Sequence, residues 1–320
     1  MKLETLEKSN VQFAILLILL AFYLLTKNII FSVAIALFVI FVVAFEFYVG
    51  IKKHGWNYEI IDTLLTIIGA LILWFGFQYV MHSPTPISAI VSCSMVPSLN
   101  RGDLVLVKGE DFYNITSIHV NSQDVNALYS DITHFYRKDN NTYKEFFSTR
   151  GSILSFCQAT LEDFCVDFSK HPDEFYETKG NFTFYYGNCV RKLQNGERLE
   201  PCLVKIGYKD KNFTINKNND VLVYRPTSND LFSLFGDIVH RGYLKLIDEN
   251  GNVYFLTKGD NNNVLDIQFY SYKYGMGNHP INKKNVLGKV IFRIPYLGYY
   301  KLFLSFYFKE DSLCNTRLIT

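Results

Sequence analysis

Long apolar runs dominate the first 80 positions of the chain, and shorter alternating segments follow them. The runs are Val11–Leu25, Ile29–Val49 and Ile60–Val80. A helix that spans a bilayer needs about 20 apolar residues, so the second and third runs are long enough, whereas the first needs flanking residues. The pattern predicts a membrane region at 1–82 with three transmembrane helices, at 11–28, 29–49 and 60–80, and two such helices are the alternative.

The residues around these runs bear on processing and orientation. The first run could be a cleaved secretory signal, but no small-x-small cleavage site follows Leu25 before the second run begins. Lys2 and Lys8 precede the first run, Lys27 lies between the first two, and Lys52–His54 precede the third. Because basic loops stay in the cytoplasm, the N-terminus and the 50–59 loop are predicted to be cytoplasmic. The third helix then delivers the following residues to the extracytoplasmic side, close to the membrane surface.

Beyond residue 83 the pattern changes to short strands bounded by turn residues. β-Branched runs at Leu104–Val107, Val221–Tyr224 and Val286–Phe292 predict strands. Ile238–Leu256 predicts a hairpin, because Asn250-Gly251 separates two such runs. We therefore expect 83–108 and 220–300 to form a mostly antiparallel β domain. The apolar stretch Ile294–Phe308, which continues into the C-terminal tail 301–320, could lie in the membrane interface, with a core strand and packed turn as the alternative.

The stretch 109–219 differs in composition, and we interpret it as a large, β-rich insertion. It holds four of the six cysteines, Cys157, Cys165, Cys189 and Cys202, and Asn-x-Ser/Thr sequons at Asn114, Asn140, Asn181 and Asn212. An even cysteine count with several sequons agrees with an exported, oxidising location. Four cysteines allow three pairings, which the sequence leaves open. A zinc site is the alternative, disfavoured because there is no CxxC pair and His171 is the only histidine near the cysteines.

Composition adds little to this picture. The length of 320 residues suggests about two domains. The formal net charge of +2 gives no reason to expect nucleic acid as a partner. The 22 Tyr and 28 Phe are typical of a membrane-associated, β-rich protein with large apolar surfaces.

An unusual motif lies between the last apolar run and the first strand. Ser92-Cys93-Ser94-Met95-Val96-Pro97 is followed at once by Arg101-Gly102-Asp103. Pro97 cannot continue a helix, and Gly102-Asp103 turns the chain into the strand, so we expect Ser94 on an extended segment at a strand edge. A serine hydroxyl becomes a nucleophile only with a base within about 2.6–3.2 Å and a third group that orients the base.

Candidates for these two groups lie in and after the predicted hairpin. His240 is part of the first strand, and the hairpin would bring Asp260 and Asp266 back towards it. The result is a Ser–His–Asp set in the chain order Ser94, His240, Asp266, and the same geometry is known in other chain orders. Each residue alone also fits an ordinary strand or turn, since Asp and Asn commonly bond their own backbone in turns.

The ordered combination resembles the type I signal peptidases, in particular the branch of archaea and the endoplasmic reticulum. The matching segments are Ser94–Pro97, Val239–Arg241, Thr257–Asn262 and Asp266, and they lie in about a third of the chain. In that branch a His stands where bacterial relatives use a catalytic Lys. The resemblance implies Ser94 as nucleophile, His240 as general base, Asp266 as the group that orients the imidazolium, and Asp260 as support. It implies that the Ser92 hydroxyl and the Ser94 backbone N–H bind the oxyanion.

The resemblance also implies a biological role and a location. The chain would be a membrane-anchored, mainly β serine endopeptidase that removes signal peptides and needs no metal or organic cofactor. Its partners would be secretory preproteins and the lipid bilayer, with other signal peptidase or translocon subunits as further candidates. It would be integral to an archaeal cell membrane or the endoplasmic reticulum membrane, with its catalytic domain on the extracytoplasmic or lumenal side.

Several departures from the family keep alternatives open. Cys93 stands where the family usually has Gly, and Asn219-Asp220 replaces Gly-Asp before the strand at 221. Cys93 is therefore an alternative nucleophile, and Lys245 or Lys258 an alternative base of the bacterial kind. A peptidase-like surface or scaffold protein that has lost activity, and that acts through 109–219, is the alternative function.

Overall fold

The computed structural model describes residues 9–26, 29–110, 113–139, 142–160, 162–304 and 312–319. The chain divides into two compact units, which we describe separately. One unit comprises Met1–Val80 with Tyr299–Lys309, and the other comprises Met81–Gly298 with Glu310–Thr320.

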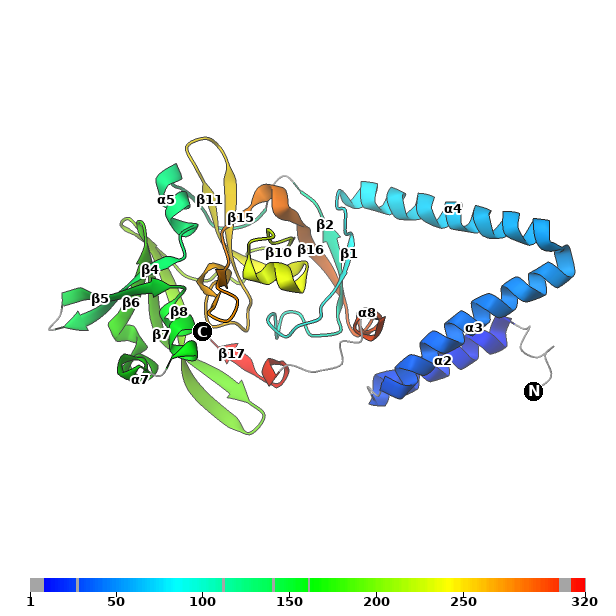
Figure 1. Cartoon of the computed structure of the whole chain (residues 1–320), viewed down its shortest axis with the longest axis horizontal. Coiled ribbons are helices and arrows are strands. Elements are labelled where there is room, and N and C mark those ends of the chain that lie inside the picture. The colour runs from blue at the N-terminus through cyan, green and yellow to red at the C-terminus, as the bar shows by residue number, and fades with distance from the viewer. Residues whose placement is uncertain are drawn as a thin grey trace. The chain divides into compact units, whose positions relative to one another are not determined.

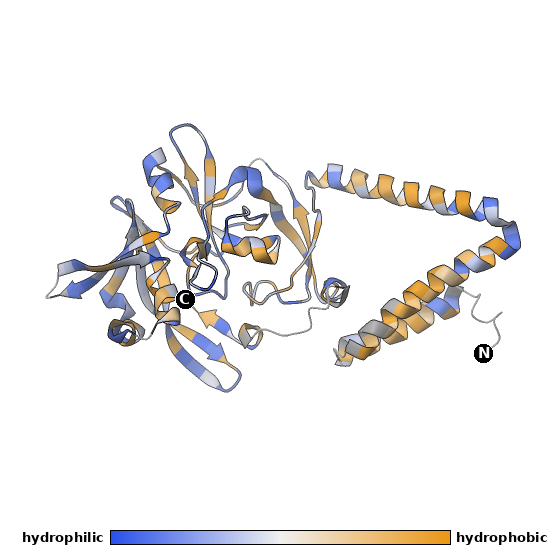
Figure 2. Cartoon of the chain, viewed as in Figure 1, coloured by the Kyte–Doolittle hydropathy of each residue, from blue (hydrophilic) through white to orange (hydrophobic). Residues whose placement is uncertain are grey.

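The first unit is helical. It contains α2 (Ser9–Thr26), α3 (Ile29–His54), α4 (Trp56–Met81, whose last residue belongs to the second unit) and α8 (Tyr299–Leu304). Hydrophobic residues, in orange, predominate along α2, α3 and α4 (Figure 2). Gln12 is buried and donates to Glu46 of α3, which pairs two polar groups on otherwise apolar helices.

The three predicted helices are present, with different bounds. The second continues to His54 and the third begins at Trp56, because polar residues can extend a helix beyond its apolar stretch. Among the described residues, α4 is the one helix long and apolar enough to cross a membrane, and α2 contributes a shorter apolar helix, Asn10–Tyr23. Positions 27 and 28 of the first predicted helix lie outside the described residues, as do Lys2, Lys8 and Lys27.

The second unit is built on two sheets (Figure 1). The first runs in the order β1-β2-β16-β10-β11-β12-β15, and β3 pairs with β11 in parallel, whereas the other pairs are antiparallel. Its strands are β1 (Ile87–Ala89), β2 (Leu104–Lys108), β3 (Ser117–His119), β10 (Val221–Tyr224), β11 (Ile238–Ile247), β12 (Val253–Lys258), β15 (Ile281–Asn282) and β16 (Val286–Ile294). The predicted strands and the hairpin are confirmed.

The second sheet lies almost entirely within 109–219 and runs in the order β5-β4-β6-β7-β8-β9, with β17 paired to β7. Its strands are β4 (Ile132–Asp139), β5 (Thr142–Arg150), β6 (Phe175–Lys179), β7 (Phe182–Leu193), β8 (Gly196–Tyr208), β9 (Lys211–Phe213) and β17 (Arg317–Ile319). The mainly β, antiparallel prediction is therefore confirmed. β17 comes from the C-terminal tail, and Arg317–Ile319 form a strand of this sheet.

Short elements complete the second unit. They are α5 (Ser122–Leu128), α6 (Ile153–Ala159), α7 (Asp163–Lys170), the strand pair β13 (Tyr270–Ser271) and β14 (Met276–Gly277), and the 3₁₀ turns η1 (Pro172–Glu174), η2 (Leu231–Phe235), η3 (Asp266–Gln268), η4 (Lys283–Asn285) and η5 (Ser312–Asn315).

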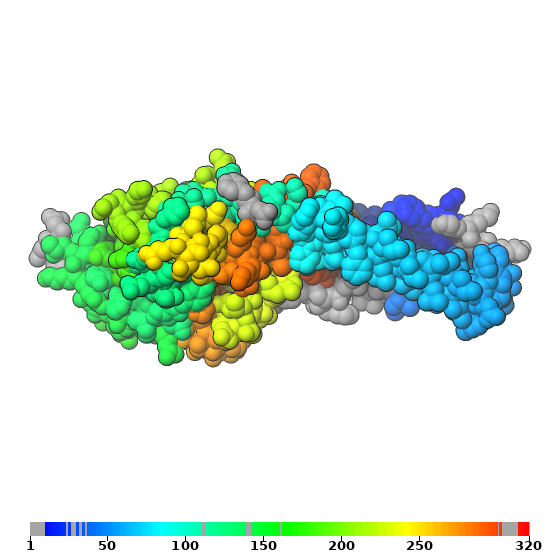
Figure 3. Space-filling view, turned by 90° about the horizontal axis from the view of Figure 1, so that it is seen from above, coloured from blue at the N-terminus to red at the C-terminus, as the bar shows by residue number. Residues whose placement is uncertain are grey.

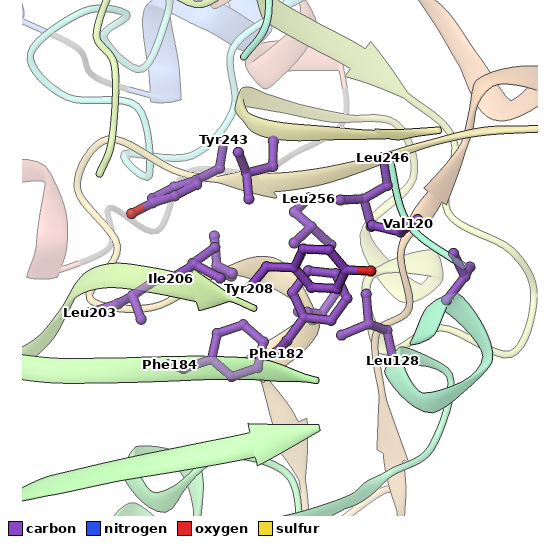
Figure 4. Packing of buried hydrophobic residues seen from close by; sticks show 14 residues of the cluster. Val120, Leu128, Phe182, Phe184, Leu203, Ile206, Tyr208, Tyr243, Leu246 and Leu256 are labelled. Carbon is purple, nitrogen blue, oxygen red and sulfur yellow. The ribbon is translucent and has the colours of Figure 1, made fainter. Parts of the chain in front are cut away.

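An apolar core joins the two sheets. Phe182 and Phe184 of β7 face Leu246 of β11 and Leu256 of β12, and each is fully buried (Figure 4). Burying one such side chain contributes about 1.5–3 kcal/mol. The space-filling view shows atoms of the hairpin, in yellow, against green atoms of 113–219 (Figure 3). The second sheet thus packs against the strands that carry the predicted site.

Three disulfides resolve the cysteine pairing. Cys157 bonds Cys165 and Cys189 bonds Cys202, which is one of the three pairings that the sequence left open. Cys93 bonds Cys314, which lies 221 positions later. The zinc alternative at the cysteines and the Cys93 nucleophile are therefore wrong, because a sulfur in a disulfide is not a thiolate.

Candidate active site

Ser94 lies in a compact loop between β1 and β2. The backbone N–H of Leu99 donates to the Met95 carbonyl at 3.0 Å, so the chain makes a tight turn after Ser94. The extended segment predicted from Pro97 is wrong. Proline lacks a backbone N–H, but this turn requires no hydrogen bond from the nitrogen of Pro97. The turn points Met95 and Leu99 into the core, where each side chain is at most 5% exposed.

The ends of this loop are tied together. The N–H of Gly102 donates to the Ile90 carbonyl, and the N–H of Ile90 donates to the Asp103 carbonyl, each at 2.8 Å. Gly102 has a φ of 89°, a left-handed conformation that favours glycine. The Gly102 turn expected from the sequence thus closes the loop at its base.

His240 projects from β11 towards Ser94. Its Nε2 lies 2.9 Å from Ser94 Oγ, within the reach of a general base. The side chain is only 5% exposed, and it pairs across the sheet with Leu222 of β10. The hairpin prediction therefore placed this histidine on the correct element.

Asp266 begins η3 and lies on the far side of the imidazole. Its Oδ2 is 2.7 Å from His240 Nδ1, which completes the Ser94–His240–Asp266 series expected from the sequence. The same oxygen accepts from the hydroxyls of Tyr224, at 2.8 Å, and Thr257, at 2.6 Å. Burial raises the pKa of Tyr224 well above its ordinary value, and the nearby Asp266 charge raises it further, so this phenol remains a donor.

Sequence reasoning missed the two hydroxyl donors. Tyr224 lies two positions after Leu222, the residue opposite His240, so strand alternation places it on the same face of the sheet as Leu222. That register could have identified it once the β10–β11 pairing was assumed. Thr257 belongs to the family-like segment before Asp260, but no role was assigned to it.

A loop at η2 covers one side of the imidazole. The Phe232 ring meets the His240 ring edge to face, with 6.0 Å between ring centroids. Asn278 Oδ1 accepts the Phe232 backbone N–H at 2.8 Å, and Asn278 Nδ2 donates to the Asp266 carbonyl at 2.9 Å. One buried amide thus fixes the aromatic cover relative to the backbone of Asp266.

Asp260 contacts the loop that carries Ser94 and not the imidazole. Arg241 Nε and Nη2 donate to its two oxygens, each at 2.8 Å, and Ser98 Oγ also donates to it. Burial raises the pKa of Asp260, but the bonds and charge of Arg241 outweigh this and bring the pKa below its ordinary value. The ionised carboxylate ties the loop that carries Ser94 to β11.

The two donors assigned to oxyanion binding from the sequence are the Ser92 hydroxyl and the Ser94 backbone N–H. Ser92 Oγ lies 3.1 Å from Ser94 Oγ. Among the hydrogen bonds of the described residues, the backbone N–H of Ser94 has no acceptor. Both groups assigned to oxyanion binding from the sequence are therefore close to the hydroxyl, and this N–H is free to donate.

Gly259 allows the loop after β12 to approach Ser94. A Cβ at this position would lie 2.7 Å from the Ser94 carbonyl oxygen, closer than side chains tolerate. Two positions later, the N–H of Asn261 donates to that same carbonyl at 2.7 Å. The backbone of Ser94 is thus held by the Gly-Asp-Asn segment.

The two lysines considered as bases do not hydrogen-bond to Ser94 in the structure. Lys258 is buried, and its Nζ donates to the Gly259 carbonyl at 3.4 Å. Burial lowers the pKa of Lys258 from 10.5 to about 8, against the opposing effect of Asp260 and Asp266. Lys245 lies on β11 five positions beyond His240.

The chain is similar in sequence to several known proteins. The chain is 36% identical over 90 residues to the signal peptidase complex catalytic subunit SEC11 of Eremothecium gossypii, an alignment of 28% of this chain and 49% of that protein. It is 32% identical over 88 residues to SEC11C of Homo sapiens, which aligns 28% and 41% of the two chains. The signal peptidase complex catalytic subunit sec11 of Dictyostelium discoideum is 36% identical over 62 residues. That alignment covers 19% of this chain and 35% of that protein.

These alignments are partial. The chain spans about half or less of the length of the curated relatives that it matches. No protein-family model matches the chain. The resemblance to signal peptidases of the endoplasmic-reticulum branch is nevertheless confirmed, because these relatives are catalytic subunits of that enzyme.

Proposed function

We propose that this chain is a membrane-bound serine endopeptidase that removes signal peptides from exported preproteins. The observation that carries the proposal is the hydrogen-bonded series Ser94–His240–Asp266 in a chain similar to signal peptidase catalytic subunits. A serine hydroxyl within 2.9 Å of an imidazole that a buried carboxylate orients is the arrangement required for nucleophilic catalysis at neutral pH.

In the first half of the reaction, Ser94 Oγ attacks the scissile carbonyl carbon. His240 Nε2 takes the hydroxyl proton as the new C–O bond forms, and Asp266 stabilises the resulting imidazolium. The carbonyl oxygen becomes an oxyanion, which the Ser92 hydroxyl and the Ser94 N–H would bind. One such donor is typically worth about 3–4 kcal/mol of transition-state stabilisation.

In the second half, the peptide C–N bond breaks and the imidazolium gives its proton to the leaving amine, which is the new N-terminus of the mature chain. His240 then takes a proton from water, and the hydroxide attacks the acyl carbon. The C–Oγ bond breaks and Ser94 recovers its proton from His240. Water is the co-reactant of this scheme, and no redox change occurs.

The sheet supports an extended substrate. β1 is the terminal strand of the eight-stranded sheet, and it leads directly into the loop that carries Ser94. A peptide added along such an edge gains backbone hydrogen bonds and presents alternate side chains to the enzyme. We propose that the residues before the cut bind in this way.

A membrane location fits both the substrate and the chain. α4 is long and apolar enough to span a bilayer and ends at Met81, 13 positions before Ser94. Lys52, Lys53 and His54 precede it, so we propose that its first residue faces the cytoplasm and that Ser94 acts on the extracytoplasmic or lumenal side. Other subunits of a signal peptidase complex are candidate partners, since the relatives carry that complex in their names.

The test is cleavage of a preprotein by the full-length protein in detergent or vesicles. Wild type should release the mature chain, with the cut mapped by mass spectrometry after the signal peptide, and Ser94→Ala should lose almost all of this activity. Ser148→Ala, at an exposed serine on β5 of the second sheet, is the control for serine loss away from the site. If wild type cleaves none of several preproteins, this proposal fails, and the result favours the alternative of an inactive, peptidase-like scaffold protein.

A further inference from the structure

Asn261 holds the backbone on both sides of the nucleophile. Its N–H donates to the Ser94 carbonyl at 2.7 Å, and its side-chain Nδ2 donates to the Cys93 carbonyl at 3.2 Å. Asn261 is fully buried. The two peptide groups that flank the Cα of Ser94 are therefore fixed by one residue, and the orientation of its side-chain amide decides whether the bond to the Cys93 carbonyl can form.

Arg191, on β7 of the second sheet, donates to both the side chain and the backbone of Asn261. Its Nη1 donates to Asn261 Oδ1 at 3.0 Å, and its Nη2 donates to the Asn261 carbonyl at 3.2 Å and to Asn263 Oδ1 at 2.7 Å. Its Nε pairs with Glu200 of β8. The guanidinium is planar, and the Arg191 side chain is only 3% exposed. This one group therefore donates to both Asn261 and Asn263, in the segment that contacts the loop carrying Ser94.

The C-terminal segment closes the same cluster. Asn261 Nδ2 also donates to the carbonyls of Leu313, at 3.1 Å, and Thr316, at 3.2 Å, while Asn261 Oδ1 accepts the Leu318 N–H at 2.8 Å. Leu318 of β17 pairs directly with Arg191 of β7, and Figure 1 shows β17, in red, beside that sheet. The Cys93–Cys314 disulfide ties this segment covalently to the residue before Ser94.

We propose that Arg191 is a positioning residue for Ser94, acting through Asn261, so that the second sheet is part of the machinery that holds the nucleophile. Arg191 donates to neither Ser94 nor His240, and its effect passes through the bonds of Asn261 to the backbone at Cys93 and Ser94. The inference rests on the peptidase function proposed above. It extends that function to a region of the chain outside the family-like segments.

The chain supplies a matched control. Arg198 of β8 donates to the other oxygen of Glu200, at 2.9 Å, but its side chain is 63% exposed and it has no bond to Asn261. Arg198→Met therefore removes an arginine from the same carboxylate without touching the nucleophile loop. Arg191→Lys keeps a charge opposite Glu200 but has one nitrogen in place of the planar fork. Arg191→Met with Glu200→Gln removes both charges, in case the single change at Arg191 does not fold.

The experiment compares kcat and KM for preprotein cleavage by the full-length variants, together with hydrogen–deuterium exchange of the 92–100 segment. We expect Arg191→Lys to lower kcat about 10- to 100-fold with KM within about twofold, since a nucleophile misplaced by about 1 Å costs rates of this order. Exchange should rise in 92–100 and stay unchanged in the β11–β12 hairpin. Arg198→Met should match wild type in both measurements, and the charge-neutral double variant should behave as Arg191→Lys.

Three results would overturn the inference: an unchanged kcat in Arg191→Lys, a change confined to KM, or exchange that rises throughout the second unit. If wild type cleaves no preprotein, the peptidase function fails separately. The exchange comparison then still decides whether Arg191 holds the loop, because it does not depend on turnover.

Discussion

The carboxylate of Asp266 is used asymmetrically. Oδ2 accepts from His240, Tyr224 and Thr257, whereas Oδ1 is buried and has no hydrogen-bond partner among the described residues. Oδ2 lies beside His240 Nδ1, which leaves Nε2 facing Ser94. One carboxylate oxygen thus controls the orientation of the imidazole.

Replacing Asp266 by Asn should remove this control with little change in volume. The Asn side chain would place an N–H group among the side chains that now surround the Asp266 carboxylate. His240 should then adopt the tautomer that is unsuited to act as a base, and kcat should fall by about 10³–10⁴. The assay is preprotein cleavage with a thermal unfolding midpoint for each variant. Glu145→Gln is the control, because His134 and Glu145 form a comparable pair on the second sheet, with 2.7 Å between Nδ1 and Oε1. Activity that survives Asp266→Asn contradicts the assigned role.

At the scale of elements, the sequence predicted local structure well and long-range structure poorly. The Asn250-Gly251 turn predicted the β11–β12 hairpin because turn chemistry acts over a few residues. The same reasoning placed His240 on the correct strand. It missed the turn at Ser94, because burial of Met95 and Leu99 depends on β-strands distant in sequence.

Asp260 links β11 to the nucleophile loop, and this link should be sensitive to acid. Its pKa is lowered in the folded state, so its contribution to stability is present above the ordinary carboxyl pKa of about 3.9 and is lost as the pH falls through the folded value. We expect Asp260→Asn to lower the unfolding temperature at pH 6 and to differ less from wild type as the pH drops below about 4. A difference that stays constant from pH 6 to pH 3 would contradict this assignment.

Lys258, the last residue of β12, should act in the opposite pH range. Its folded pKa of about 8 lies below the unfolded value, so burial of the charged amine costs stability below about pH 8. Between pH 8 and about 10.5 the unfolded chain binds more protons and the cost is relieved, by up to about 3 kcal/mol. Lys258→Met should flatten the rise of the unfolding midpoint over this range. Identical pH curves for the two proteins would show that Lys258 keeps its ordinary pKa.

At the scale of the whole molecule, the sequence revealed the family-like segments but not what joins them. The site residues of 83–108 and 220–300 could be found because their motifs are short and ordered. The contacts of Arg191 with Asn261, and of Cys93 with Cys314, join positions 70 and 221 residues apart, and no local pattern encodes such pairs. The C-terminal tail, considered for the membrane interface, includes a strand of the second sheet.

Glycosylation of the Asn-x-Ser/Thr sequons reports on which side of the membrane the second unit lies. Asn114, Asn181 and Asn212 are exposed in the structure, whereas Asn140 lies outside the described residues. If the second unit is lumenal, expression with microsomes should give a mass shift that a glycosidase reverses and that substitution of these asparagines by Gln reduces. Full protection of the unit from added protease is the accompanying result. An unmodified chain that protease digests would contradict the proposed orientation.

The most direct test of the central claim is the rate of preprotein cleavage by His240→Ala beside Lys258→Met, both as full-length proteins with unfolding midpoints recorded. We expect His240→Ala to lose activity by about 10³–10⁴ or more, because Ser94 then has no imidazole within reach, while Lys258→Met keeps a rate within about tenfold of wild type. Retained activity in a folded His240→Ala protein, with loss in Lys258→Met, would contradict the Ser94–His240–Asp266 mechanism and favour lysine as the base.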